Sequence, residues 1–281
     1  MTNQNTCTDF NEKSILVTGI IQKTDRSENL NPQQESRISD KMRHFSDLRL
    51  QNKHLIRKDL EAAGFSCTLC GKCCERVEDD NSVFILPAEI EKIEAEIGLN
   101  RSEFIMPLFP DFYGISNDRT VSVDFSFFPD ILESVSDQID DSGRIHTFGW
   151  MLGRSKNGTC IFLEPETKKC QIYSVRPGLC RTYPFYFTGS AVEICECEGV
   201  GTVLKTAANL SNELEDAVYD RVLNEQNDLL KTQFFWEKES KNIKYNTKEG
   251  LEKAFENLAQ GLLHFIVYDG SGIYETSVQL F

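Results

Sequence analysis

Residues 65–77, FSCTLCGKCCERV, carry four cysteines within eight positions, Cys67, Cys70, Cys73 and Cys74. Two residues between a pair of cysteines let a turn aim both sulfurs at one ion, and a third cysteine three residues later is typical of iron–sulfur proteins. Buried cysteines often serve as small apolar side chains, but that role does not explain four of them beside Gly71 and Lys72. This spacing therefore predicts a metal site.

Five more cysteines follow in two later groups, Cys160, Cys170 and Cys180, then Cys195 and Cys197. Together with the first run they give nine clustered thiols, more than the four that one zinc ion or one cubane cluster needs. The sequence therefore predicts either two metal centres or one centre with spare cysteines. Cys7 stands apart from all three groups and is not expected to be a ligand.

The choice of metal stays open between zinc and iron, because thiolate ligands suit both. We favour an iron–sulfur cluster, since structural zinc sites usually pair their ligands two and two. The adjacent Cys73 and Cys74 could be ligands of two different centres, or one of the two thiols could be a spare that binds no metal. Arg176 and Arg181 lie beside the later cysteines and are expected to contact the cofactor, because guanidinium groups offset the negative charge of bound thiolates. His146 is expected to be a partly buried, hydrogen-bonded side chain rather than a ligand.

The chain has 281 residues and a formal net charge of −14, with a sequence pI near 4.8. This charge argues against binding of nucleic acid, whose phosphates attract clustered Lys and Arg. No run of eighteen apolar residues and no basic, apolar leader is present, so neither a membrane span nor export is expected. A cytoplasmic location is then the default expectation, and in that compartment cysteines are reduced and available to bind metal.

The apolar pattern predicts an α+β fold, in which an irregular cysteine-rich metal-binding core is joined by a small sheet and a helical C-terminal part. Three regions are expected: a polar extension over residues 1–63 with a helix leading into the core, a cysteine-cluster domain over residues 64–200, and a helical part over residues 201–281 that ends in a hairpin.

Periodic apolar residues and capping signals predict helices over residues 40–63, from Pro87 to Gly98, over residues 203–236 and from Asn246 onward. Alternation and turn signals predict strands at residues 83–86, at residues 120–128 and on both sides of the DGSG turn at residues 269–272. Residues 23–39 are expected to be flexible and residues 133–143 to form a surface loop. Phe148 and Trp150 are expected to shield the metal centre from water.

The sequence resembles the CxxCxxCC cysteine-cluster family in the order and spacing of four blocks: FSCTLCGKCC, LPAEIEKIEAEIGLNRSEFI, CIF and CQIYSVRPGLCRTYPF. That family is described as a zinc- or iron-chelating domain, and the resemblance covers roughly residues 65–200. It implies that the cysteines from Cys67 to Cys180 are metal ligands or their close neighbours, together with Cys195 or Cys197.

The favoured function is a metal-binding protein with a redox role, as an electron carrier or part of an oxidoreductase, acting with a protein partner or substrate that the sequence does not name. One alternative is a binding module stabilised by zinc. Another is a protein-modifying enzyme, since the family resembles the cysteine-rich part of a flagellin lysine methylase. No nucleotide-binding fingerprint accompanies the cysteines, and no catalytic residue is assigned.

Overall fold

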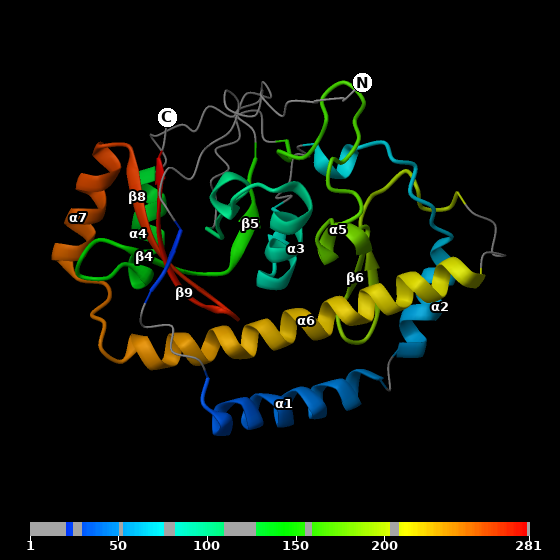
Figure 1. Cartoon of the computed structure of the whole chain (residues 1–281), viewed down its shortest axis with the longest axis horizontal. Helices are drawn as coiled ribbons and strands as arrows, with labels where there is room; N and C mark the ends of the chain where they lie inside the picture. The colour runs from blue at the N-terminus through cyan, green and yellow to red at the C-terminus, as the bar shows by residue number, and fades with distance from the viewer. Residues whose placement is uncertain are drawn as a thin grey trace.

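The computed structural model describes residues 21–24, 30–50, 53–75, 82–109, 128–154, 159–202 and 208–279. One long helix, α6 (Ala208–Ser240), runs along the long axis of the molecule (Figure 1). Helix α1 (Pro32–Leu50) lies along one side of α6, and α2 (Lys53–Ala63) packs against its N-terminal half. The contact with α2 includes an ion pair of 2.6 Å between Arg57 and the buried Glu215.

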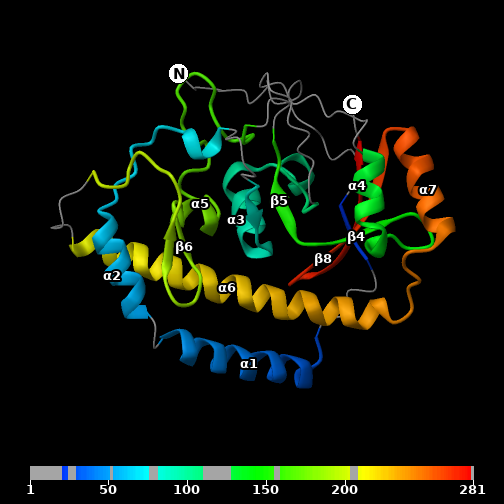
Figure 2. The same cartoon turned by 180° about the vertical axis from the view of Figure 1, so that it is seen from behind.

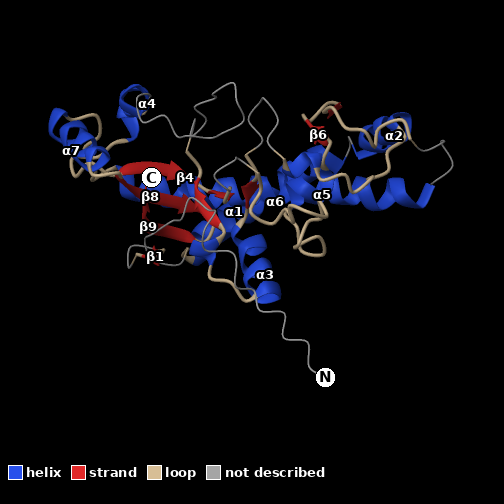
Figure 3. Cartoon of the chain, turned by 90° about the horizontal axis from the view of Figure 1, so that it is seen from above, coloured by secondary structure: helices blue, strands red, loops and turns tan. Residues whose placement is uncertain are grey.

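The main sheet lies at the C-terminal end of α6 and has four strands in the order β1 (Gln22–Lys23), β9 (Gly272–Gln279), β8 (Leu262–Asp269) and β4 (Ile145–Phe148). Strands β8 and β9 form an antiparallel hairpin, whereas β4 runs parallel to β8. The C-terminal half of β8 is buried on both faces, which explains its nearly continuous apolar sequence. Helices α7 (Lys248–Ala259) and α4 (Phe128–Ser134) contact each other at this end (Figure 3).

A second sheet has three strands in the order β2 (Phe84–Ile85), β5 (Trp150–Leu152) and β3 (Ile105–Pro107). Gly149 links it to the main sheet with a φ of 89°, and a Cβ there would lie 2.4 Å from the ring of Phe84. Only glycine fits this link comfortably, because a side chain would meet both backbone strain and a collision. Helix α3 (Pro87–Ile97) follows β2 and ends at Gly98, whose φ is 69°.

A smaller unit stands at the N-terminal end of α6. It consists of the short helix α5 (Gly178–Thr182) and the antiparallel pair β6 (Phe185–Phe187) and β7 (Val192–Ile194). Its core joins Phe185 of β6 to Ile56 and Leu60 of α2 and to Val218 of α6. The long helix α6 therefore contributes to two separate apolar clusters, one with β8 and β9 through Phe235 and one with α2 and β6 through Val218.

The predicted α+β class is confirmed, as are the strand near residues 83–86, the helix from Pro87 and the C-terminal hairpin. The long helix expected over residues 203–236 is also present, although residues 203–207 lie outside the described part. The nine cysteines within the described residues, however, do not form a buried core: three are exposed and six are partly exposed. No helix within the described residues is long and apolar enough to cross a membrane.

Three local predictions were wrong. Residues 32–39 belong to α1 and are not a flexible segment, because packing against α6 outweighs their weak apolar pattern. Residues 133–143 are not simply a surface loop, since Val135 and Ile139 are buried. Phe128 lies in α4 rather than in a strand; the rest of that predicted strand, residues 120–127, falls outside the described residues, as does Cys7.

Candidate metal centre

The first cysteine run follows α2 in an irregular segment. Leu69 and Gly71 have positive φ angles of 56° and 74°, which turn the chain into the 3₁₀ turn η2 (Lys72–Cys74). The Sγ atoms of the two adjacent cysteines at the end of this turn lie 3.9 Å apart. Gly71 allows a close approach, because a Cβ there would lie 2.6 Å from the carbonyl oxygen of Lys168. The first run therefore lies directly against the chain that carries the second group.

A series of turns holds Cys160 and Cys170 next to the first run. The Cys160 N–H donates a hydrogen bond of 2.8 Å to the carbonyl oxygen of Cys74. Lys168 forms an ion pair of 2.6 Å with Glu75, one residue beyond Cys74. The side chains of Cys160 and Cys170 are partly buried against the main apolar core. Backbone and side-chain contacts thus fasten two cysteine groups that are about ninety residues apart in the chain.

Cys180 lies in α5, which is clamped between two other helices. The first amide of α5 donates a hydrogen bond of 2.7 Å to Glu89 of α3. On the other side, the guanidinium of Arg221 on α6 donates hydrogen bonds to the hydroxyl of Thr182 and, at 3.3 Å, to the carbonyl oxygen of Phe185. These contacts fix the position of the Cys180 backbone relative to both α3 and α6.

The last two cysteines are tied to different neighbours. The Cys195 N–H donates a hydrogen bond of 2.9 Å to Pro184, which follows α5. The Sγ of Cys197 accepts a hydrogen bond of 3.5 Å from the Gly199 N–H. Gly199 in turn accepts a hydrogen bond of 3.0 Å from the Ser66 N–H, just before the first cysteine run. The third group therefore lies beside the start of the first.

All three groups lie toward the end of the molecule that carries α2 and α5 (Figure 2). Across the described residues, however, no three Cys, His, Asp or Glu side chains are gathered closely enough to hold a metal ion. The backbone contacts bring the cysteine segments together, and the thiol side chains would have to rotate toward a common point to bind metal.

Burial and neighbouring thiols raise the pKa values of Cys73, Cys74 and Cys180. A hydrogen bond with Cys160, followed by burial and the neighbouring thiols, raises the pKa of Cys74 to about 12. Burial raises the pKa of Cys180, and the nearby thiols of Cys74 and Cys73 raise it further. A hydrogen bond with Cys74, together with burial, raises the pKa of Cys73. Several thiolates so close together repel one another, and a bound cation would offset that repulsion.

Arg176 supplies positive charge to this region. Its guanidinium lies 4.0 Å from the centre of the Tyr173 ring, and its Nε is buried with no hydrogen-bond partner. The positive charge of this guanidinium acts to lower the pKa values of Cys73, Cys170 and Cys180, although burial and neighbouring thiols raise these pKa values overall. An all-sulfur donor set, a nearby cation and an unpaired N–H fit a thiolate-bound metal, because N–H groups commonly hydrogen-bond ligating sulfur.

Arg181, the other predicted arginine, is exposed, and its contact with a cofactor stays a prediction. Phe148 and Trp150 do not shield the cysteines. Trp150 is buried in the main core and donates a hydrogen bond of 2.8 Å to Asp269, while the ring of Phe148 packs edge-on against Trp236. Both aromatic side chains therefore stabilise the sheet end of the molecule.

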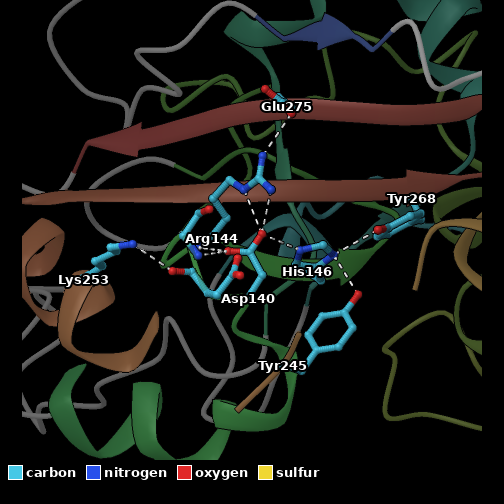
Figure 4. A network of polar contacts seen from close by, with 9 residues as sticks. Asp140, Arg144, His146, Tyr245, Lys253, Tyr268 and Glu275 are labelled. Atoms are coloured by element: carbon cyan, nitrogen blue, oxygen red, sulfur yellow. Dashed lines mark hydrogen bonds and ion pairs between the residues drawn. The ribbon is translucent and has the colours of Figure 1, made fainter. Parts of the chain in front are cut away.

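A second polar cluster, which sequence patterns did not predict, surrounds His146 at the sheet end (Figure 4). His146 is 2% exposed, with Nε2 3.2 Å from Asp140 and Nδ1 2.9 Å from the hydroxyl of Tyr268 and 3.2 Å from that of Tyr245. Burial would raise the pKa of Asp140, but hydrogen bonds from His146 and Arg144 outweigh it and lower that pKa well below its usual range. His146 is thus hydrogen-bonded, as expected, but it is fully rather than partly buried, and the cluster joins β4 to β8 and to the loop before α7.

Comparison with known proteins identifies the cysteine-bearing segment. Residues 66–196 match the CxxCxxCC family. The model of this family is described as a "putative zinc- or iron-chelating domain", which supports metal binding by the CxxCxxCC segment. The match includes every clustered cysteine except Cys197, which lies one residue beyond it.

A relative of the CxxCxxCC segment is an uncharacterized protein of Methanocaldococcus jannaschii, which is 46% identical over 43 residues. The alignment covers 15% of this chain and 24% of the archaeal protein, so the chain spans about a quarter of that relative. No solved structure matches the fold.

Proposed function

We propose that the CxxCxxCC segment binds metal through its cysteine thiolates and holds it as an iron–sulfur cluster. The observation that carries this proposal is the meeting of three cysteine groups, which together span about 130 residues of the chain, through specific backbone hydrogen bonds. The bonds from Cys160 to Cys74 and from Ser66 to Gly199 hold irregular chain segments together. Disulfides are not needed to explain this convergence, because all nine described cysteines are free.

Iron–sulfur chemistry is favoured over zinc by the ligand pattern. Three cysteines spaced by two residues occur in cluster-binding loops, whereas structural zinc sites usually draw their ligands as two pairs. Arg176 adds a buried N–H and a positive charge that favours the thiolate forms of Cys73, Cys170 and Cys180. Hydrogen bonds and charge near the sulfurs are the means by which proteins adjust the reduction potential of such clusters.

We further propose that the centre exchanges electrons with a protein partner. An iron–sulfur cluster supplies one-electron chemistry when bound. Cys67, Cys73 and Cys195 are exposed, so the edge of the thiol cluster reaches the protein surface. Free thiols at the surface require a reducing compartment, which agrees with an expected cytoplasmic location.

The test is anaerobic purification of the full chain, with analysis of iron, zinc and acid-labile sulfide and an absorption spectrum. We expect iron and sulfide together, and broad visible absorption that bleaches on reduction. A colourless protein with stoichiometric zinc, after iron and sulfide were supplied during expression, would favour the zinc-stabilised module. A protein that binds neither metal would refute the proposal.

The variant Cys70→Ser/Cys74→Ser removes two thiols from different sides of the first run and should lose all metal. Cys7→Ser is the matched control, since Cys7 lies outside the CxxCxxCC segment, and its metal content should equal that of the wild type. Full metal content in the double variant would show that the cysteines are not the ligands.

A further inference from the structure

Three exposed apolar side chains lie on the segments that carry the cysteines. Within the described residues five large apolar side chains are exposed, and three of the five are Leu69, Tyr173 and Ile194. Leu69 belongs to the first cysteine run, Tyr173 to the second group and Ile194 to the third, where it directly precedes Cys195. Single exposed apolar residues are common on protein surfaces, but here each cysteine group contributes one.

The three segments adjoin one another at the end of the molecule that carries α2 and α5 (Figure 2). An ion pair between Lys72 and Glu198 joins the first run to the third group. A second ion pair, of 2.6 Å between Lys168 and Glu75, joins the first run to the second group. The first run therefore borders both other segments, and the three apolar side chains belong to one region of the surface.

Leu69 has a backbone conformation that its own turn does not explain. Its φ is 56°, in the left-handed region that a residue with a Cβ adopts unfavourably and that glycine or asparagine adopts more easily. The turn between Cys67 and Cys70 requires this backbone angle, but it does not require a leucine whose side chain is 53% exposed. Because unfavourable backbone conformations concentrate at functional sites, Leu69 indicates contact with another molecule.

Tyr173 is both exposed and held in place. Its ring is 44% exposed, and the guanidinium carbon of Arg176 lies 4.0 Å from the ring centre. This cation–π contact restrains the ring, so the side chain loses little freedom when a partner covers it. Tyrosine and arginine are also among the residues that contribute most to binding energy in protein interfaces. The pair therefore has the properties of an interface anchor.

The third segment surrounds its apolar residue with negative charge. Glu193, Glu196 and Glu198 are all exposed, and they flank Ile194 and Cys195. This stretch of six residues contains no cation, and the whole chain carries a net charge of −14. A partner whose own apolar patch is bordered by lysine or arginine would be attracted and oriented by these carboxylates, whereas an acidic partner would be repelled.

We propose that Leu69, Tyr173 and Ile194 form the docking surface for a redox protein that presents a basic rim around an apolar patch. This assignment rests on the proposed function, because it names the partner with which the metal centre exchanges electrons. Cys195 is exposed next to Ile194, so a partner seated on this surface would lie at the edge of the thiol cluster. One electron passes from the reduced centre to a one-electron acceptor in the partner, such as a ferric haem, and no bond forms between the two proteins.

The experiment follows oxidation of the reduced, cluster-loaded full chain by a basic c-type cytochrome, a probe whose lysine residues surround an exposed haem edge. In stopped flow, the second-order rate constant should fall about fivefold or more between about 20 and 300 mM salt, because salt screens the attraction. Leu69→Asn and Ile194→Gln should each slow the reaction at least about threefold at low salt. Glu193→Gln/Glu196→Gln should make the rate constant less dependent on salt.

Control variants carry the same chemical changes elsewhere on the surface. Leu229→Gln replaces an exposed leucine of α6, and Glu213→Gln/Asp220→Asn removes two exposed charges of α6; both should keep the rate constant and salt dependence of the wild type. Ferricyanide, a small acceptor that needs no docking surface, should oxidise Leu69→Asn and Ile194→Gln at the wild-type rate. Leu69→Asn should not lower the urea midpoint of unfolding, because asparagine tolerates the left-handed backbone.

Three results would overturn the docking surface while leaving the metal centre intact. The first is a wild-type rate constant with the cytochrome in both apolar variants. The second is equal slowing with ferricyanide, since the substitution would then act on the centre itself. The third is a wild-type dimer in sedimentation that Leu69→Asn separates, since a second copy of the chain would then occupy the surface. A wild type that holds no redox-active centre would refute the proposed function, and with it the partner assigned to this surface.

Discussion

Asp228 of α6 has a buried carboxyl that should make the protein less stable as the pH rises. Its side chain is 8% exposed, and its Oδ1 accepts a hydrogen bond of 2.9 Å from the Gly270 N–H in the turn between β8 and β9. Burial and, second, the charge of Asp269 raise the pKa of Asp228 from an ordinary 3.8 to about 7. Lys231 acts in the opposite direction with a smaller effect.

The folded chain therefore keeps the Asp228 proton up to about pH 7, whereas the unfolded chain releases it near pH 4. The contribution of this group to stability is complete below about pH 4 and is lost as the pH rises through 7. At about 1.4 kcal/mol for each pKa unit, the loss reaches about 4 kcal/mol, and relaxation around the charged carboxylate reduces that value.

Asp228→Asn removes the charge and leaves an amide oxygen that can accept the Gly270 hydrogen bond. At pH 8 the variant should be more stable than the wild type by about 2 to 4 kcal/mol, whereas at pH 4.5 the two should agree within about 1 kcal/mol. Urea unfolding between pH 4.5 and 8, followed by circular dichroism, measures this difference.

Asp220→Asn is the matched control, because Asp220 lies exposed on the same helix. Its unfolding free energy should run parallel to that of the wild type across the pH range, which separates the Asp228 effect from the overall negative charge of the chain. If the Asp228→Asn curve also runs parallel to the wild type, burial of this carboxyl does not govern the pH dependence and the reasoning is wrong.

Three further outcomes follow from single contacts. Trp150→Phe leaves the buried Asp269 carboxyl without its indole donor, which lies at 2.8 Å. The free energy of unfolding, measured in urea, should fall by about 2 kcal/mol. A loss below about 0.5 kcal/mol would contradict this prediction. Gly71→Ala should lower the free energy of unfolding by about 2 kcal/mol and weaken Co²⁺ binding, because the new Cβ collides with Lys168. Gly98→Ala is the control: its φ is similar but no atom lies near its Cβ, so it should lower the free energy of unfolding by only about 1 kcal/mol. Equal losses in the two variants would argue against the collision. Arg176→Gln should lower the midpoint potential of the cluster in a potentiometric titration, because reduction adds negative charge that the guanidinium offsets. Arg176→Lys keeps the positive charge and should lower the potential less. An unchanged potential in Arg176→Gln would show that Arg176 does not adjust the potential of the cluster.

Elements with strong local signals could be predicted from the sequence. Pro87 at a helix start, Gly98 at its end and the DGSG turn each act through the backbone of their own segment, and the structure has them where the pattern indicated. Residues 32–39 of α1 were not predicted as helix, because their stability comes from packing against α6, a contact that their polar sequence does not reveal. Local chemistry is visible in a sequence, and long-range packing is not.

The candidate site, too, could be predicted where its signal is local in the sequence and not where it depends on long-range contacts. Cysteine spacing alone indicated a metal-binding segment, and the family match supports it. The meeting of the cysteine segments could not be predicted, because it depends on hydrogen bonds such as that between Ser66 and Gly199, residues far apart in the chain. The buried pair Asp140 and His146 was also invisible as a pair, since neither residue lies in a recognisable motif.

The central claim is that cysteine sulfur binds the metal. X-ray absorption at the metal edge, measured on the anaerobically purified full chain, tests it most directly. We predict a first coordination shell of sulfur alone at about 2.3 Å, with neighbouring iron atoms if the centre is a cluster. A first shell dominated by nitrogen or oxygen would contradict the account, because no arrangement of the nine clustered cysteines could then be holding the metal.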